Sequence, residues 1–375
     1  MSNQALLIVG ASARAACFSA RRSSFSPYWI DQYGDHDLVE NFPGVRVPTK
    51  HYPDGILDLL PKSSDVPFLF TGALENHLGI LEKLESLRPL LGNSAAVCRA
   101  VRDPYRLRNC FESAGIKHPQ IVSPDKVVEG LADYLIKPLR SAGGFGIRHY
   151  RAGEGENTRQ EYIQEFIEGE SRAGIFLGNG KSAFLLGVTR QLVGEAELHA
   201  AEFSYCGSIG PLPLDAYECE QWMDIGNVLS REFGLLGLFG VDAIRRAGDI
   251  YPVEVNPRYT ASVEVLELAL QLPVIALHVD ACRGKMIAPV IPNIDTTMAK
   301  AYLFAGNDLM SPGDVNALYE GDDSFPLTAD IPHADTCIPR GHPLMTVFAE
   351  GSSPEEVMQT LIDRANLLYS RFDVV

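Results

Sequence analysis

The chain has 375 residues, enough for two or three domains with substantial hydrophobic cores. Its 48 acidic and 32 basic side chains give a formal net charge of -16 without a cluster of lysine and arginine, so we do not expect it to bind nucleic acid or an anionic membrane surface. Seven cysteines without a Cys-x-x-Cys pair argue against a disulfide framework or a zinc site, and they favour reduced thiols and a cytoplasmic location.

The N-terminal part alternates short apolar runs with helical segments, which predicts an α/β domain with a parallel sheet. Ala5–Val9 reads as a buried first strand and not as a signal peptide, because it has no basic leader. The turn Gly10–Arg14 leads into a helix but lacks the glycine spacing of a dinucleotide site. Tyr28–Asp31 and Phe68–Thr71 predict further strands, and no run reaches the roughly 18 apolar residues of a membrane span.

A lysine followed by glycines marks the middle of the chain. Tyr134–Pro138 predicts a strand that delivers Lys137 at its end, and Ser141–Ile147 follows with glycines at positions 143, 144 and 146. A nucleoside triphosphate needs a positive charge and backbone N–H groups that approach closely without Cβ interference. The order differs from a P-loop, where the glycines precede the lysine. Taken alone, the segment also fits an ordinary flexible turn with a solvated lysine.

The segment Tyr162–Glu170 follows the glycines. It reads as a strand that runs into an extended linker, whose backbone could hydrogen-bond the edge of an adenine ring. Glu168 or Glu170 would then be available for ribose hydroxyls.

A predicted hairpin carries the most informative side chains. Leu238–Ile244 and Ile250–Val255 are strand-like, and the stretch Arg245–Asp249 between them contains a glycine that suits the turn. A turn centred near Gly248 places Asp242 opposite Glu254, with Cβ atoms about 5 Å apart. Two such carboxylates repel each other, and a hard divalent cation such as Mg²⁺ would reverse that interaction.

Two further polar residues share the face of Glu254, because side chains two positions apart on a strand point the same way. Asn256 offers a neutral oxygen ligand, and Arg258 can neutralise a phosphoryl group or an oxyanion. The alternative is a surface hairpin with scattered charges. Apolar neighbours on both strands argue against it, because they predict burial.

A loop that could recognise the substrate lies before this hairpin. Thr189–Val193 predicts a strand, and the glycine- and serine-containing loop Phe203–Pro211 follows it. Arg190 could hold a carboxylate or could simply be solvated.

Together, in this order and spacing, these segments resemble the ATP-grasp superfamily over about residues 95–285. The resemblance implies that Lys137 contacts the α- and β-phosphates, that the three glycines close over the triphosphate, and that Arg258 stabilises acyl-phosphate chemistry. It implies that Glu165 and Ile167 meet adenine through their backbone and that Glu170 serves the ribose. The implied nucleotide-binding residues are Lys137, Gly143, Gly144, Gly146, Glu165, Ile167, Glu170 and Arg106, and the implied magnesium ligands are Asp242, Glu254 and Asn256.

One position departs from the family pattern. Most members place a second ATP-binding lysine after an aspartate in the helix before the lysine strand, and here that position is Pro104. Arg106 or Arg108 could supply the charge, although arginine differs from lysine in reach and geometry.

The C-terminal part predicts two strands and a helix. Ala299–Ala305 and Pro343–Ala349 read as strands, and a helix begins after Ser353 with proline in its first turn. The stretch Gly341–Gly351 resembles the small C-terminal domain of biotin-carboxylase-related ligases. We therefore expect an α/β protein of the ATP-grasp fold: a Rossmann-like parallel-sheet domain at 1–94, a two-lobed nucleotide-binding region at 95–288 and a small α+β domain at 289–375.

The function implied by the resemblance is phosphoryl transfer from ATP, with Mg²⁺, to a small-molecule carboxylate, followed by attack of an amine on the acyl phosphate. Overall likeness to carboligase-like members suggests cofactor biosynthesis linked to one-carbon metabolism. A bicarbonate-using carboxylase and a non-catalytic ATP-binding protein stay open, and Pro104 favours the latter. The expected partners are the carboxylate and amine substrates, without nucleic acid or membrane, and a homodimer stays open.

Overall fold

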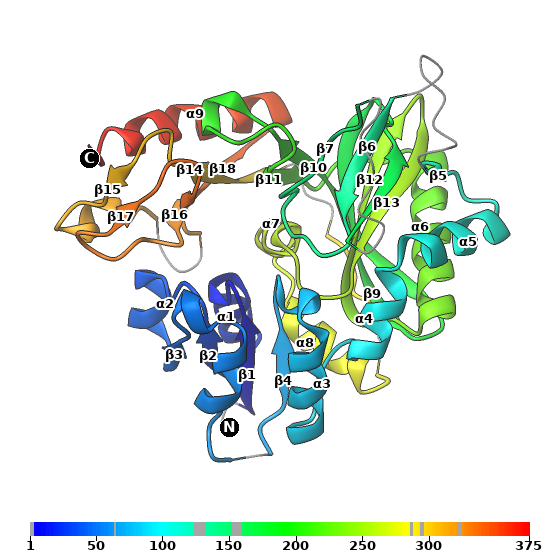
Figure 1. The fold of residues 1–375 in the computed structure, drawn as a ribbon, viewed down its shortest axis with the longest axis horizontal. Helices are drawn as coiled ribbons and strands as arrows, with labels where there is room; N and C mark the ends of the chain where they lie inside the picture. The colour runs from blue at the N-terminus through cyan, green and yellow to red at the C-terminus, as the bar shows by residue number, and fades with distance from the viewer. Residues whose placement is uncertain are drawn as a thin grey trace.

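A four-stranded parallel sheet, in the order β3-β2-β1-β4, forms the N-terminal part of the protein (Figure 1). The computed structural model describes residues 4–63, 65–123, 133–151, 160–285, 288–292, 296–321 and 325–375. The elements of this part are β1 Gln4–Gly10, α1 Arg14–Arg22, β2 Phe25–Asp31, α2 His36–Asn41, β3 Gly44–Arg46, β4 Phe68–Phe70 and α3 Leu78–Leu87. The predicted parallel sheet is confirmed.

The central strand β1 explains why this sheet is covered on both faces. Leu6, Leu7, Ile8 and Val9 are all fully buried, because successive side chains point into two different cores. One core packs against α1 and α8 (Val274–Cys282), and the other packs against α3. A continuous apolar run is the sequence pattern that such a strand requires.

Two helices connect this sheet to a small antiparallel one. The helices are α4 Ala95–Val101 and α5 Pro104–Ala114, and the sheet has the order β5-β8-β6-β7. Its strands are β5 Ile121–Val122, β6 Tyr134–Pro138, β7 Arg148–His149 and β8 Glu161–Glu165. Helix α5 begins where the side chain of Asp103 accepts hydrogen bonds from the N–H groups of Tyr105 and Arg106, and proline occupies its first turn.

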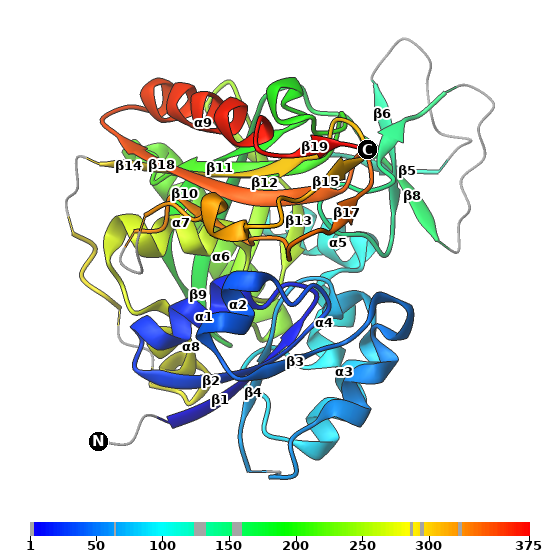
Figure 2. The same ribbon diagram turned by 90° about the vertical axis from the view of Figure 1, so that its left-hand side faces the viewer.

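A large antiparallel sheet of eight strands, in the order β13-β12-β9-β10-β11-β14-β18-β16, spans the rest of the molecule. Its strands are β9 Glu170–Asn179, β10 Ala183–Val193, β11 Tyr205–Gly210, β12 Leu236–Arg246, β13 Asp249–Asn256, β14 Thr297–Phe304, β16 Thr328–Ala329 and β18 Pro343–Gly351. Helix α6 (Ala216–Phe233) packs beside β10 and β13, and α9 (Pro354–Tyr369) covers β14 and β18 (Figure 2). The C-terminal strands therefore continue the sheet of the central region through the pairing of β11 with β14.

A three-stranded sheet in the order β17-β15-β19 completes the C-terminal part, with β15 Leu309–Met310, β17 Cys337–Ile338 and β19 Asp373–Val374. The proposed domain boundary near residue 289 thus separates strands that belong to one sheet.

A helix must be long and apolar to span a membrane, which sets a requirement for the helices of the described residues. Not one of them is long and apolar enough by itself. Helix α7 (Ala261–Leu270) together with α8 meets the length and composition, but the two are bent by 115°.

Candidate active site

The hairpin of β12 and β13 has the predicted register. Asp242 pairs with Glu254 across the two strands, and the turn contains Ala247 and Gly248, both with positive φ. Two successive residues with positive φ match the right-handed twist of a hairpin. The prediction that the two carboxylates face each other is therefore confirmed.

Asp242 is held by two amide groups. Gln191 of β10 donates its Nε2 to Oδ1 of Asp242 at 2.9 Å, and Asn256 donates its Nδ2 to Oδ2 at 3.0 Å. Burial and the adjacent charge of Glu254 raise the pKa of Asp242 to about 7. Two carboxylates at directly opposite positions of the hairpin form a site that favours a cation.

Arg258 connects this hairpin to the N-terminal sheet. Its Nε donates to Oε1 of Glu75 at 2.7 Å, and its terminal nitrogen donates to Oδ1 of Asn256 at 3.2 Å. Burial alone would lower the pKa of Arg258, but the carboxylates of Glu75, Glu254 and Asp242 raise it. The guanidinium is thus fixed and charged beside the carboxylate pair.

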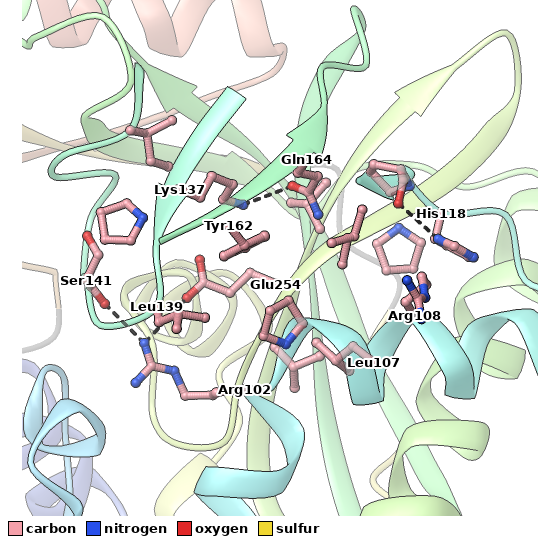
Figure 3. Close-up of a pocket in the computed structure, with 18 of the residues that line it drawn as sticks. Arg102, Leu107, Arg108, His118, Lys137, Leu139, Ser141, Tyr162, Gln164 and Glu254 are labelled. Atoms are coloured by element: carbon pink, nitrogen blue, oxygen red, sulfur yellow. Dashed lines mark hydrogen bonds and ion pairs between the residues drawn. The ribbon is translucent and has the colours of Figure 1, made fainter. Parts of the chain in front are cut away.

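Lys137 lies at the end of β6 and points into the space above Glu254 (Figure 3). Its Nζ donates to Oε1 of Gln164 at 3.2 Å and lies 5.9 Å from the ring centroid of Tyr162. Burial by itself would lower the pKa of Lys137, but Tyr162 and Glu254 raise it. The ammonium is therefore charged at neutral pH.

The glycine-rich loop needs glycine for two separate reasons. Gly143, Gly144 and Gly146 have φ values of +62°, +83° and +81°, which other residues rarely adopt. A Cβ at Gly144 would also come within 1.8 Å of the carbonyl oxygen of Phe203. The loop is held against residues 203–205, where the Tyr205 N–H donates to the Gly143 carbonyl at 3.0 Å.

A pocket lies between the small sheet, α5 and β13, with about 710 Å³ of empty space counted out to open solvent. Three cations and one carboxylate line it: Arg102, Arg108, Lys137 and Glu254. With histidine neutral, these four side chains sum to a charge of +2. Apolar side chains of α5, β5 and β13 form another part of the wall, namely Leu107, Phe111, Ile121, Val253 and Val255. An anionic ligand with an apolar ring system suits this combination.

Comparison with known proteins agrees with this geometry. A family model described as an ATP-grasp domain matches residues 101–262. Residues 101–262 form an ATP-grasp domain. The resemblance noted in the sequence is therefore confirmed.

Three proteins show how widely the ATP-grasp likeness extends. A formate-dependent phosphoribosylglycinamide formyltransferase of Xanthomonas oryzae is 27% identical over 283 residues, which cover 66% of this chain and 67% of the relative. Biotin carboxylase of Campylobacter jejuni superposes with a TM-score of 0.71 at 11% identity, covering 94% of this chain and 89% of that one. The L-amino acid ligase of Bacillus licheniformis gives 0.66 at 13% identity, covering 100% and 99%. The two structures extend the agreement in fold to almost the whole chain.

Six residues that the sequence assigned to the ATP-grasp nucleotide site do not line the pocket, and two of them, Gly143 and Gly146, lie in the same loop as Gly144, which does. The Glu165 N–H donates to the Gln120 carbonyl at 2.8 Å, which joins β8 to β5. The Ile167 side chain is buried, and the Glu170 carboxylate accepts a hydrogen bond from Arg172. Arg106 is exposed on α5, whereas Arg102 and Arg108 line the pocket. The assignments of Glu165, Ile167, Glu170 and Arg106 stay predictions.

Five polar residues of the site received no role from the sequence. They are Glu75, Arg102, Tyr162, Gln164 and Gln191. The sequence pointed to Arg190 and not to its neighbour Gln191. The Nε of Arg190 is buried and has no hydrogen-bond partner among the described residues.

The donor set fits a hard divalent cation. Asp242 and Glu254 offer carboxylate oxygens and Asn256 an amide oxygen, and the described residues contain no cluster of three or more histidine, cysteine or acidic side chains that could hold a metal. Mg²⁺ commonly takes one or two carboxylates and completes its shell with substrate phosphates and water. A site with two carboxylates beside a cationic pocket meets that requirement.

Proposed function

We propose that this enzyme uses ATP and Mg²⁺ to activate a small-molecule carboxylate as an acyl phosphate, which an amine then attacks. The observation that carries the proposal is that Lys137 and Glu254 line one pocket with excess positive charge, and that Glu254 pairs with Asp242 on the neighbouring strand. Arg258 is held beside this pair through Asn256. A polyphosphate would balance the cations, and a divalent metal would balance the carboxylates.

The chain's own residues have distinct roles in this reaction. Lys137 offsets charge on the phosphates, and the glycine-rich loop excludes water that would hydrolyse the intermediate. Asp242, Glu254 and Asn256 would hold Mg²⁺, which when bound offsets negative charge on the phosphoryl group. Arg258 stabilises the oxyanion that develops on the carboxylate during both steps.

The proposed reaction has two steps, phosphoryl transfer and acyl transfer. A carboxylate oxygen attacks the γ-phosphorus, the bond from that phosphorus to the β,γ-bridging oxygen breaks, and ADP leaves with the electron pair. The amine nitrogen then attacks the acyl carbon, the bond from that carbon to the phosphate-bearing oxygen breaks, and phosphate leaves. The amine loses a proton to solvent.

Bicarbonate is the second candidate for the carboxylate substrate. The likeness to biotin carboxylase over 94% of this chain favours it. In that case bicarbonate would stimulate ADP release when no amine is present.

The first test is a screen for ADP release with Mg²⁺ across small carboxylates, alone and paired with amines. Formate heads the panel, because the formyltransferase relative is formate-dependent. Formate with an amine, or another carboxylate–amine pair, should stimulate ADP release above either compound alone. Stimulation by bicarbonate alone would replace the ligase with a carboxylase, and ATP binding without ADP release under any condition would leave a nucleotide-binding protein.

A variant tests the metal assignment. Glu254→Gln removes one charge of the carboxylate pair, so we expect turnover to fall at least about 100-fold while the melting temperature stays close to native. The matched control is Glu232→Gln, because Glu232 is exposed on α6 outside the site. Native turnover in Glu254→Gln would reject the assignment.

A further inference from the structure

Arg102 occupies the corner between α4 and α5, directly after Val101. Its side chain is 11% exposed and reaches into the nucleotide pocket, near Glu254 and the start of the glycine-rich loop (Figure 3). Pro104 lines the same pocket but carries no charge, and Arg106 is exposed. Arg102 is thus the cation that this corner directs into the pocket.

The guanidinium of Arg102 joins three segments that are distant in sequence. One terminal nitrogen donates to Oδ1 of Asn76 at 2.8 Å and to the Glu75 carbonyl at 3.1 Å. The other donates to the Ser141 carbonyl at 3.1 Å, and Asn76 donates to the same carbonyl at 3.2 Å. The base of the glycine-rich loop is therefore fixed through Arg102 to the short 3-10 helix Leu74–Asn76, which follows β4.

The charge of Arg102 is not neutralised by these contacts. All three acceptors are neutral oxygens, and the nearest acidic oxygen, Oε1 of Glu254, lies 3.9 Å away. Glu254 is also a proposed magnesium ligand, so its charge would be shared. The Glu75 carboxylate also attracts Arg102, but it is paired with Arg258. A largely buried guanidinium that hydrogen-bonds only neutral oxygens favours an anionic ligand, because burial strengthens the attraction between unlike charges.

We propose that Arg102 contacts the phosphates of the nucleotide and that the same guanidinium holds the glycine-rich loop closed over them. The inference rests on the proposed use of ATP at this pocket. Arginine suits both tasks, because its planar fork presents five donors and can bind phosphate and backbone oxygens together.

The first test measures nucleotide affinity by calorimetry with Mg²⁺, using a non-hydrolysable ATP analogue and adenosine. Arg102→Met should weaken binding of the analogue about 30-fold, the effect of one lost charged hydrogen bond, and leave adenosine binding within about two-fold of native. The matched control Arg231→Met, at an exposed arginine of α6 outside the pocket, should bind both ligands like the native protein. An unchanged affinity for the analogue, or an equal loss for adenosine, would overturn the inference.

The second test follows loop closure by cleavage with chymotrypsin at Phe145, whose side chain is 83% exposed in the glycine-rich loop. The analogue should slow cleavage of the native protein and of Arg231→Met. Arg102→Lys keeps a charge but loses the fork, so it should retain most of the affinity and lose most of the protection. Full protection in Arg102→Lys would refute the role in closure, and this variant serves if Arg102→Met does not fold.

The two proposals fail in different ways. If the native protein binds neither ATP nor its analogue, the proposed function is wrong. If the native protein binds the analogue and Arg102→Met binds it equally well, only the role of Arg102 is wrong.

Discussion

Gln191 holds a proposed metal ligand without being one itself. Its amide donates to Oδ1 of Asp242, and the strand pairing places Ser208 directly opposite it on β11. A hydrogen-bonded neighbour of this kind fixes the direction of a ligand oxygen and lowers the entropy that metal binding must overcome.

We therefore expect Gln191→Leu to weaken divalent-cation binding by about 10-fold to 100-fold, as losses of such neighbours typically do. Calorimetric titration of the nucleotide-free protein with Mn²⁺ measures this separately from turnover. Gln359→Leu is the matched control, because Gln359 is an exposed residue of α9. Equal Mn²⁺ affinity in Gln191→Leu and native protein would show that Asn256 alone orients Asp242.

The same strand shows what sequence can and cannot provide for a single residue. Period-two alternation predicts that Thr189 and Gln191 share a face and that Arg190 points to the other. It does not tell which face meets the hairpin, because β9 lies between β10 and β12 and that order depends on long-range pairing. The charge of Arg190 therefore made it the candidate for holding a carboxylate. In the structure it is Gln191 that donates a hydrogen bond to the Asp242 carboxylate.

At the scale of elements, the glycine-rich loop depends on its contact with residues 203–205. Gly143 and Gly144 both have positive φ, but a Cβ at Gly143 would meet nothing within 4 Å, whereas one at Gly144 would collide with the Phe203 carbonyl. The two positions therefore separate backbone strain from steric collision.

We predict that Gly143→Ala costs about 1 kcal/mol of stability, the penalty for a left-handed backbone, and retains nucleotide affinity. Gly144→Ala should weaken binding of the ATP analogue at least about 10-fold, because the loop must move away from Phe203 by more than 1 Å. Thermal melting and calorimetry of both variants provide the measurement. Equal affinities in the two variants would show that contact with Phe203 does not hold the loop in its binding position.

Elements governed by local chemistry were predictable from sequence, and elements governed by distant partners were not. The hairpin register follows from its turn residues, and α9 begins after Ser353 because that side chain accepts from the Glu356 N–H. The backbone contact of Glu165 and Ile167 with adenine stays a prediction. The Glu165 N–H donates to the Gln120 carbonyl, directly before β5, a strand of two residues with no periodic signal.

At the scale of the whole molecule, a buried ionic cluster joins the N-terminal sheet, α7 and the C-terminal strands. Arg14 pairs with Glu264 and Asp330, and Lys300 donates to Glu264 at 2.6 Å. Three further acids, Asp31, Asp35 and Asp37, lie on the N-terminal side. Two cations against five carboxylates give a charge of -3 when all are ionised, so the three parts meet across an excess of negative charge.

The pKa values of these acids indicate how the contact responds to pH. Burial raises the pKa of Asp31 to about 7, and burial with Asp330, opposed by Arg14, raises that of Asp37 to about 6. Burial would also raise the pKa of Asp330, but Arg14 and Lys300 lower it to about 2. Raised acids bind protons more tightly in the folded state, so their stabilisation is lost as pH rises from about 4 to about 7. The contribution of Asp330 is lost as pH falls from about 4 to about 2.

We therefore predict that the free energy of unfolding is highest between about pH 4 and 5 and falls by on the order of 2–4 kcal/mol towards pH 8, measured by urea denaturation without nucleotide.

Asp35 provides the decisive variant. Burial and the charges of Asp330, Asp31 and Asp37 raise its pKa, and its half-buried side chain does not cap α2. Asp35→Asn should stabilise the protein by about 1 kcal/mol at pH 8 and change little at pH 4, because it removes an acid whose ionised form the folded protein disfavours. Asp58→Asn, at an exposed acid of the same domain, should leave the pH profile unchanged. A destabilised Asp35→Asn protein at pH 8 would show that cations outside the cluster already balance this charge, and that the three parts of the molecule do not meet across a net repulsion.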